Sequence, residues 1–151
     1  MARILVTGGC GYVGSVLVPK LLNAGHTVRA LDILWFGSYL KPHPRLKIIR
    51  GDIREASFTP GEYDAIIHLA AVANDPAGDL NPKLTWEINA LATTQLAASA
   101  AKNGIKHFIY ASSGSVYGIS EEPEVTESVP LVPLSEYNKT KMVAERVLLS
   151  Y

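Results

Sequence analysis

The sequence predicts an α/β fold, in which helices flank a doubly wound parallel sheet of about five strands. Three observations predict this class. Short apolar segments rich in β-branched residues recur along the chain, helix-like segments lie between most of them, and a glycine-rich turn directly follows the first one. Strands that are buried on both faces of a parallel sheet are expected to have this continuous apolar character.

Five segments are predicted to be strands because each is short, apolar and bounded by polar or glycine residues. In chain order they are residues 3–6, 27–31, 46–49, 65–69 and 107–111. The link between the third and fourth strands contains Pro60 and Gly61, so we expect no more than a turn or two of helix there. A complete sheet of this kind usually has about six strands or more, so the sheet is expected to be cut short.

Three helices are expected between and after the strands. They cover about residues 12–24, about residues 81–103, and a segment that begins near Ser135 and continues to the end of the chain. Gly25 is expected to close the first helix, and Pro19 inside it should kink it or lower its stability. Asn81 followed by Pro82 is a favourable helix start, because Asn caps well and proline suits the first helical position.

The composition excludes several classes of protein. Lys+Arg and Asp+Glu each number 14 in 151 residues, so no net charge attracts nucleic acid or an anionic membrane. No apolar run reaches the ~18 residues of a membrane span, and the N-terminus lacks the pattern of a signal peptide. Cys10 is the only cysteine, which excludes an intramolecular disulfide and fits a cytoplasmic protein. The histidines show no paired spacing, so no metal site is expected.

A glycine-rich segment, TGGCGYVGS at residues 7–15, separates the first strand from the first helix. Two fingerprints overlap in it. Gly9, Gly11 and Gly14 fit G-x-G-x-x-G, whereas Gly8, Gly11 and Gly14 fit T-G-x-x-G-x-x-G. Such glycines permit a tight turn and close approach of the backbone to a pyrophosphate, which the helix N-terminus attracts. The functional interpretation is a Rossmann-type dinucleotide site, and the alternative is a glycine-rich turn with no ligand.

Asp32 favours the dinucleotide interpretation. It closes the second strand, 18 residues after Gly14. There a carboxylate can accept hydrogen bonds from the adenosine ribose hydroxyls and would repel a 2′-phosphate. No arginine follows closely in DILWFGS, so NAD is favoured over NADP. The alternative for Asp32 is a cap at the strand end. Cys10, inside the glycine-rich loop, is interpreted as a small residue in a crowded loop, and the alternative for it is a redox-sensitive thiol.

Two further motifs follow the fifth strand. They are SSGSVYG at residues 112–118 and YNKTK at residues 137–141. Tyr137 and Lys141 are four residues apart on an expected helix and share a face, while Ser113 lies at the carboxyl edge of the sheet, where ligands bind. With TGGCGYVG, Asp32, GDI at 51–53, HLAA at 68–71 and Asn89, the sequence resembles the extended short-chain dehydrogenase/reductase superfamily, specifically its NAD-dependent nucleotide-sugar epimerases and dehydratases. The resemblance covers essentially the whole chain and selects the T-G-x-x-G-x-x-G register.

The resemblance implies a role for each matching residue. It makes Tyr137 the general acid/base, Lys141 the cation that binds the nicotinamide ribose and lowers the pKa of Tyr137, and Ser113 the hydroxyl that orients the substrate oxygen. The cofactor-binding positions that it implies are Gly8, Gly11, Tyr12, Val13, Gly14, Asp32, Asp52, Ile53, Leu69, Ala70, Ala71, Asn89 and Lys141. From the residues alone, we interpret His68 as a strand residue that packs internally and Asn89 as a helix anchor instead of a proton relay.

The residues after Ser113 bear on the reaction. In the dehydratases of this family Asp-Glu follows the serine position and acts as acid and base, and decarboxylating relatives keep a Glu there. Here Gly114 and Ser115 follow, which favours epimerisation through reversible hydride transfer at a secondary alcohol of a nucleotide-sugar.

The length is the main departure from the family. Extended members run to roughly twice this length, so we expect the sequence to hold the NAD-binding half with the catalytic residues and to lack the substrate lobe. An unpaired strand edge then favours a homo-oligomer or a partner chain. The alternatives are a non-catalytic NAD-binding module and an oligomerising half.

Overall fold

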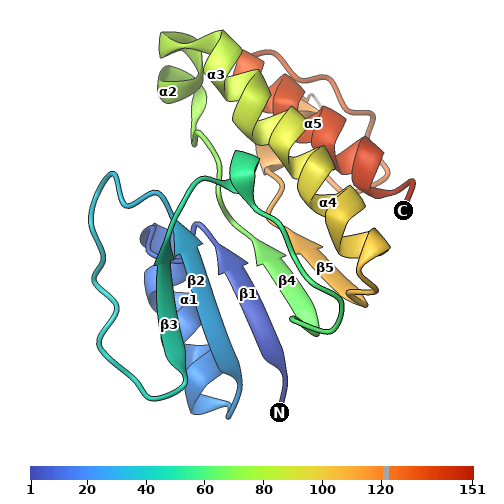
Figure 1. The fold of residues 1–151 in the computed structure, drawn as a ribbon. Coiled ribbons are helices and arrows are strands. Elements are labelled where there is room, and N and C mark those ends of the chain that lie inside the picture. Colours follow the sequence, from blue (N-terminus) through green and yellow to red (C-terminus); the bar gives the residue numbers. More distant parts are fainter. Residues whose placement is uncertain (121–122) are drawn as a thin grey trace. The chain divides into compact units, whose positions relative to one another are not determined.

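The computed structural model describes residues 1–120 and 123–151 (Figure 1). It contains five strands, which are β1 (Arg3–Thr7), β2 (Thr27–Asp32), β3 (Leu46–Arg50), β4 (Ala65–His68) and β5 (His107–Tyr110). All of them are parallel, in the order β3-β2-β1-β4-β5. The predicted α/β class and number of strands are confirmed, and each strand ends within one residue of its predicted bounds.

The helices are of mixed type and length. In chain order they are α1 (Tyr12–Asn23), η1 (Ile53–Glu55), α2 (Asp75–Leu80), α3 (Pro82–Trp86), η2 (Glu87–Ala92), α4 (Thr93–Lys102), η3 (Gly114–Tyr117) and α5 (Glu136–Leu148). None of the helices in the described part of the chain combines the length and the apolar composition needed to cross a membrane.

The chain divides into two compact units. The first consists of Met1–Ala70 and Gln95–Ala111, and it contains the whole sheet together with α1, η1 and most of α4. The second consists of Ala71–Thr94 and Ser112–Tyr151, and it contains α2, α3, η2, η3 and α5. The glycine-rich loop and Asp32 therefore lie in the first unit, whereas Ser113, Tyr137 and Lys141 lie in the second.

Strand β1 is the central strand of the sheet, with β2 on one side and β4 on the other. Val6 of β1 lies beside Ala30 of β2 on one side and beside Ile67 of β4 on the other. Apolar side chains of these strands and of α1 form a buried cluster, in which each fully buried aliphatic side chain contributes about 1.5–3 kcal/mol. The cluster consists of Ile4, Val6, Val18, Leu22, Val28 and Ile67.

Helix α1 ends where the sequence predicts. Its C-cap is Ala24, and Gly25 follows with φ of +90°, a conformation that glycine adopts without a steric penalty. Pro19 lies inside the helix, which nevertheless continues to Asn23, so the proline does not end it.

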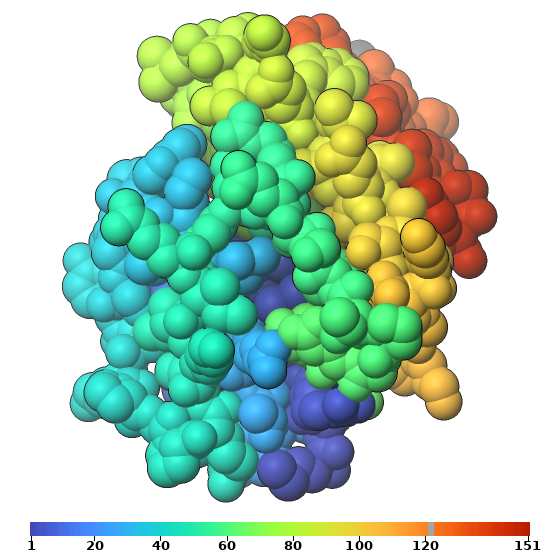
Figure 2. Space-filling view, viewed as in Figure 1, coloured from blue at the N-terminus to red at the C-terminus, as the bar shows by residue number. Residues whose placement is uncertain are grey.

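The crossover from β3 to β4 contains only the short helix η1, as its proline and glycine predict. It leaves a hollow of about 300 Å³ over the sheet. Leu5, Leu31 and Ile49 line it from the strands, together with Phe58 and Tyr63, whose rings meet edge-to-face with centroids 5.8 Å apart. In Figure 2, blue atoms of the first strands are visible at the bottom of this hollow, between the turquoise and green atoms of the crossover.

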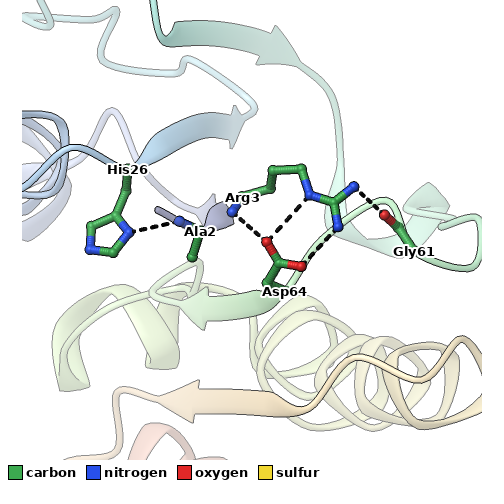
Figure 3. A network of polar contacts seen from close by, with 5 residues as sticks. All are labelled: Ala2, Arg3, His26, Gly61 and Asp64. Atoms are coloured by element: carbon green, nitrogen blue, oxygen red, sulfur yellow. Dashed lines mark hydrogen bonds and ion pairs between the residues drawn. The ribbon is translucent and has the colours of Figure 1, made fainter.

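A polar network ties the start of β1 to the segment before β4 (Figure 3). The Arg3 guanidinium pairs with the Asp64 carboxylate, with Nη2 and Oδ1 2.8 Å apart, and it also donates to the Gly61 carbonyl. The Arg3 backbone N–H donates to Asp64 Oδ2 at 2.7 Å, and the neighbouring Ala2 N–H donates to His26 Nδ1 at 3.2 Å. Hydrogen bonds from Arg3 hold the pKa of Asp64 at about 2.

The helix predicted for residues 81–103 begins and ends close to its predicted bounds but is not uniform. Asn81 caps it by accepting the Leu84 N–H at 3.1 Å, and Pro82 is its first residue. Between α3 and α4 the chain takes the wider π-helical form over η2, which the apolar spacing did not predict.

Two other features of the helices differ from expectation. Helix α2 was not predicted, although Asn74 caps it by accepting the Ala77 N–H at 3.0 Å. The prediction that the last helix continues to the end of the chain is wrong, because α5 ends at Leu148. Its start is confirmed, since Ser135 is the N-cap and accepts the Asn138 N–H.

Candidate functional site

The glycine-rich loop packs so closely that three of its glycines have no room for a side chain. A Cβ at Gly8 would lie 2.6 Å from the Ala70 nitrogen, one at Gly9 would lie 2.9 Å from the Ala30 Cβ, and one at Gly14 would lie 2.3 Å from the Gly9 oxygen. Gly8 also has φ of +67°. The internal packing of the first unit therefore accounts for Gly8, Gly9 and Gly14.

Gly11 has a different environment. Among the described residues, a Cβ there would meet only the Gly8 carbonyl oxygen, at 3.3 Å, and its φ of −74° is accessible to any residue. Gly11 is the N-cap of α1, which has no side-chain cap, and the side chains of Tyr12 and Val13 in the first turn are exposed. Open space at the N-terminus of a helix suits close approach by a pyrophosphate. The residues present therefore fit a dinucleotide in the predicted T-G-x-x-G-x-x-G register.

Asp32 closes β2, and its carboxylate joins two loops. Oδ2 accepts the Cys10 N–H at 3.0 Å, and Oδ1 accepts the Leu34 N–H at 2.8 Å. Leu34 has φ of +62°, which is costly for a leucine, so the second bond helps to hold an unfavourable turn. A carboxylate oxygen can accept more than one hydrogen bond. Asp32 therefore serves as a cap at the strand end and still has the acceptor capacity that ribose hydroxyls need.

Cys10 lies inside the glycine-rich loop and is 5% exposed. Burial raises the pKa of its thiol, which disfavours the reactive thiolate. The environment thus supports a small residue in a crowded loop over a redox-sensitive thiol.

A buried pair of side chains joins the ends of β1 and β4. Thr7 Oγ1 and His68 Nδ1 are 2.5 Å apart, and both residues are inaccessible to solvent. The His68 ring stacks on Tyr110, with centroids 5.7 Å apart, which confirms that His68 packs internally. The Leu69 N–H donates to the Thr7 carbonyl at 2.9 Å, and the Ala70 N–H lies 3.4 Å from Thr7 Oγ1. Leu69 and Ala70 are thereby held beside the first turn of the glycine loop, while Ala71 begins the second unit.

Asp52 and Ile53 follow β3 at the start of η1. Asp52 accepts the Arg54 N–H at 2.9 Å and pairs with its guanidinium, with Nη2 and Oδ2 2.7 Å apart. The hydrogen bond from the Arg54 side chain lowers the pKa of Asp52. Ile53 is 8% exposed, so any contact of this residue with adenine would come from its backbone. Adenine binding by this pair stays a prediction.

In the second unit, Asn89 anchors the segment that follows β4. Its side chain accepts the Val72 N–H at 2.8 Å, donates to the Val72 carbonyl at 2.9 Å, and donates to Thr140 Oγ1 at 3.2 Å. Asn89 is 1% exposed. The contacts support the anchoring role that the sequence indicated, and direct cofactor binding by Asn89 stays a prediction.

Ser113, Tyr137 and Lys141 lie together in the second unit. The Ser113 hydroxyl hydrogen-bonds the Tyr137 phenol and lies 2.6 Å from Ser115 Oγ, which in turn donates to Asn138 Oδ1 at 2.6 Å. Lys141 Nζ is 5.8 Å from the centroid of the Tyr137 ring. The arrangement is that of a tyrosine able to exchange a proton, with a second hydroxyl and a cation close by.

Burial decides the charge states of these groups. Lys141 is 3% exposed, and burial lowers its pKa to about 8. Burial also raises the pKa of the Tyr137 phenol, the hydrogen bond with Ser113 lowers it, and the negative charge of Asp75 raises it. The net shift is upward in the protein without ligands, in which Tyr137 is therefore a neutral phenol at neutral pH. The lowered pKa that the resemblance implies depends on the positive nicotinamide ring as well as on Lys141, so it stays a prediction for the NAD-bound protein.

The comparison with known proteins decides the family. The model of the NAD dependent epimerase/dehydratase family matches residues 4–151. The chain belongs to this family. A UDP-glucose 4-epimerase of Lactobacillus helveticus is 30% identical over 151 residues, which are 97% of this chain and 46% of that protein. A 3 beta-hydroxysteroid dehydrogenase/Delta 5-->4-isomerase of Mycobacterium tuberculosis is 34% identical over 160 residues, with 99% of this chain and 43% of that protein covered.

Solved structures of the family share the fold. The UDP-Glc/GlcNAc 4-epimerase of Campylobacter jejuni aligns with a TM-score of 0.92 at 31% identity, covering 99% of this chain and 49% of its own. The Thermus thermophilus UDP-glucose 4-epimerase in complex with NAD aligns with a TM-score of 0.87 at 31% identity, over 99% of this chain and 50% of that one. A dTDP-glucose 4,6-dehydratase of Streptomyces venezuelae with NAD bound aligns with a TM-score of 0.88 at 30% identity, over 99% of this chain and 51% of that one. The chain spans about half the length of the epimerases and dehydratases that it matches.

One residue beside the family's Tyr137 was missed at the sequence level. Asp75, at the start of α2, acts electrostatically on the Tyr137 phenol. The signal was present, because Asn74, Asp75 and Pro76 form an N-cap, an acidic first turn and a proline, which together indicate a helix start.

Proposed function

We propose that the chain binds NAD in its first unit and supplies, in its second, the catalytic residues of an epimerase-type oxidoreductase. The substrate of this reaction would be a nucleotide-sugar, and the reacting group a secondary alcohol. The assembled group of Ser113, Tyr137 and Lys141 carries the proposal, since a non-catalytic module needs no such arrangement. NAD, when bound, would supply a hydride acceptor and donor that is regenerated in place.

The protein's own groups would move the proton. Oxidation of the alcohol would need Tyr137 as the phenolate, which takes the proton from the substrate hydroxyl while the hydride leaves, and the phenol so formed would return the proton when the ketone is reduced. Ser113 would hold the same substrate oxygen through a second hydrogen bond. Lys141, with a pKa of about 8, would carry a charge for part of the time at neutral to mildly basic pH and would bind the hydroxyls of the nicotinamide ribose.

The choice of epimerisation rests on the residues that follow Ser113. Gly114 and Ser115 offer no carboxylate, so the acid and base that an elimination requires are missing at that position. Several similar proteins are UDP-sugar 4-epimerases, although the family also includes the dehydratase and the steroid dehydrogenase described above. We therefore propose a UDP-sugar as the first substrate to test.

We also propose that residues 1–151 form the NAD-binding domain and that it self-associates. The match to about half of each relative supports the first statement. The second is supported by β5, which pairs only with β4 among the described strands and carries the exposed side chain of Ile109. Sedimentation at several concentrations tests the association, and a stable monomer throughout would contradict it.

Calorimetric titration of the chain with NAD and NADP tests the cofactor assignment. We expect at least about tenfold tighter binding of NAD, because the Asp32 carboxylate would repel a 2′-phosphate. Equal affinity for the two would overturn the assignment.

The catalytic assignment requires a second assay. The chain is incubated with NAD and UDP-glucose or UDP-N-acetylglucosamine, and the epimers are then separated. We expect weak turnover that Tyr137→Phe reduces by about 10²–10⁴-fold while NAD binding persists. Undiminished turnover in Tyr137→Phe would refute the mechanism, and NAD binding without turnover of any UDP-sugar would favour the non-catalytic module.

A further inference from the structure

A carboxylate outside the sequence motifs lies next to the turn that carries Tyr137. Ser135 is the N-cap of α5, and its Oγ accepts the Asn138 N–H at 3.1 Å. The Ser135 hydroxyl also donates to Asp75 Oδ1 at 2.6 Å. Tyr137 is the second residue of this helix. The hydrogen bond therefore ties the first residue of α2 to the first turn of α5.

A second contact lies one turn further along α2. A Cβ at Gly78 would be 3.1 Å from the Tyr137 Cβ, so the backbone of α2 approaches Tyr137 more closely than a larger residue would allow. Asp75 and Gly78 are three residues apart and share one face of the helix. That face lies against residues 135–137, which brings the charge of Asp75 close to Tyr137.

Several charged and titratable groups lie near the first turns of α5, on this helix or on the elements packed against it. They are Asp75 and Asp79 on α2, Lys83 on α3, Glu87 on η2, Tyr117 on η3, and Glu136, Lys139 and Lys141 on α5 itself. Glu136 and Lys139 pair with each other at 2.8 Å, and Lys83 and Glu87 lie 3.9 Å apart. Among the described residues, Asp75 is the one whose negative charge raises the pKa of the Tyr137 phenol, in addition to the larger effect of burial.

We propose that Asp75 is a positioning residue for Tyr137, whose carboxylate fixes the first turn of α5 through Ser135 and whose negative charge adds to burial in opposing ionisation of the phenol. The charge is supplied from α2 and not from the positions directly after Ser113, which are Gly114 and Ser115. The importance of this effect for catalysis rests on the proposed function, whereas the electrostatic effect itself does not.

Titration of the tyrosine phenols by ultraviolet difference absorbance tests the proposal, with neither cofactor nor sugar present. The transition of Tyr137 is the one that Tyr137→Phe removes. Asp75→Asn keeps the size of the side chain and an oxygen for Ser135 but removes the charge. We expect it to lower the midpoint of the Tyr137 transition by about half a pKa unit, the effect of one exposed charge several ångströms away.

Asp79→Asn is the matched control, because it removes the same charge from the same helix four residues away. We expect it to leave the midpoint unchanged. An unchanged midpoint in Asp75→Asn, or an equal shift in Asp79→Asn, would overturn the proposal. A second measurement needs no variant: added salt screens an exposed charge and should lower the midpoint in the unmodified chain. A salt-independent midpoint would also overturn it. Since the titration contains no NAD or substrate, its outcome is separate from that of the proposed function.

Discussion

Gly14→Ala tests whether the third glycine of the loop is required by packing. The added Cβ would lie 2.3 Å from the Gly9 oxygen and 2.5 Å from the Gly9 carbonyl carbon, whereas ordinary contacts begin at 3.4 Å. The backbone would have to separate by about 1 Å in a close-packed interior. Gly9 is itself tightly packed, because a Cβ at this residue would lie 2.9 Å from the Ala30 Cβ and 3.0 Å from the Val6 oxygen.

The sign of the change in the free energy of unfolding caused by Gly14→Ala distinguishes a packing effect from an effect of helix propensity. Gly14 lies in α1, where alanine would be favoured over glycine by about 1 kcal/mol if there were room. Overpacking of a close contact costs about 1–3 kcal/mol or more. Since a contact of 2.3 Å with backbone puts this site at the upper end of that range, about 3 kcal/mol less the gain of about 1 kcal/mol leaves a net loss of about 2 kcal/mol in the free energy of unfolding. That loss corresponds to a fall in Tm of about 4–8 °C for a domain of this size.

Urea and thermal unfolding followed by circular dichroism measure this loss, and Gly11→Ala is the matched control. It makes the same chemical change at the start of the same helix, where the nearest contact would be 3.3 Å. We expect Gly11→Ala to lose about 1 kcal/mol or less, the cost of alanine at an N-cap, and yet to weaken NAD binding at least about tenfold. Gly14→Ala with unchanged or raised stability would refute the packing argument. Unimpaired NAD binding by Gly11→Ala would refute the assignment of the pyrophosphate site.

Three further predictions concern stability. Asn89→Ala leaves both backbone groups of Val72 without their side-chain partner and should cost about 2–4 kcal/mol, measured by urea unfolding. Lys141 has a folded pKa of about 8 against an ordinary 10.5, so the unfolded chain holds its proton more tightly. Stability should therefore rise by about 2 kcal/mol between pH ~8 and ~10, and Lys141→Met should abolish this rise. Asp64 has a folded pKa of about 2 against 3.8, so its pairing with Arg3 stabilises the protein above pH 3.8 and is lost as the pH falls through 2. Acid unfolding of Asp64→Asn should lack this component, and an identical acid profile would contradict it.

The central strands β1, β2 and β4 could be predicted from the sequence because largely buried strands of a parallel sheet are continuous apolar runs, bounded at each end by polar or glycine residues. The edge strands β3 and β5 are partly exposed, yet they are also short apolar runs with the same kind of bounds. The helix caps at Gly25, Asn81 and Ser135 were readable for a similar reason, since each cap depends on the chemistry of one or two residues. Helix α2 was missed although its start at Asn74 and Pro76 is an equally local signal, because its six residues offer too few turns for a periodic pattern to confirm that start. The π-helical form of η2 depends on tertiary packing and leaves no signature in the spacing of apolar residues.

The candidate site likewise has features that are local sequence patterns and features that depend on the folded structure. The glycine spacing and the four-residue interval between Tyr137 and Lys141 are linear patterns, and the structure brings Tyr137, Lys141 and Ser113 together. The upward pKa shift of Tyr137 in the protein without ligands could not be predicted, because it depends on burial and on Asp75 from a segment some 60 residues away. Such an effect arises only after the chain has folded and has no counterpart in the local sequence.

The two hydrogen bonds accepted by Asp32 have a consequence for redesign of cofactor preference. A common strategy for converting an NAD enzyme to NADP is to replace the acidic residue at the end of the second strand by a neutral one. Here that exchange would also release the Cys10 N–H in the glycine loop and the Leu34 N–H that supports a positive φ. A successful redesign of this chain would therefore have to supply new acceptors for two backbone N–H groups as well as remove one charge, and glycine at position 34 would lessen the cost of the positive φ.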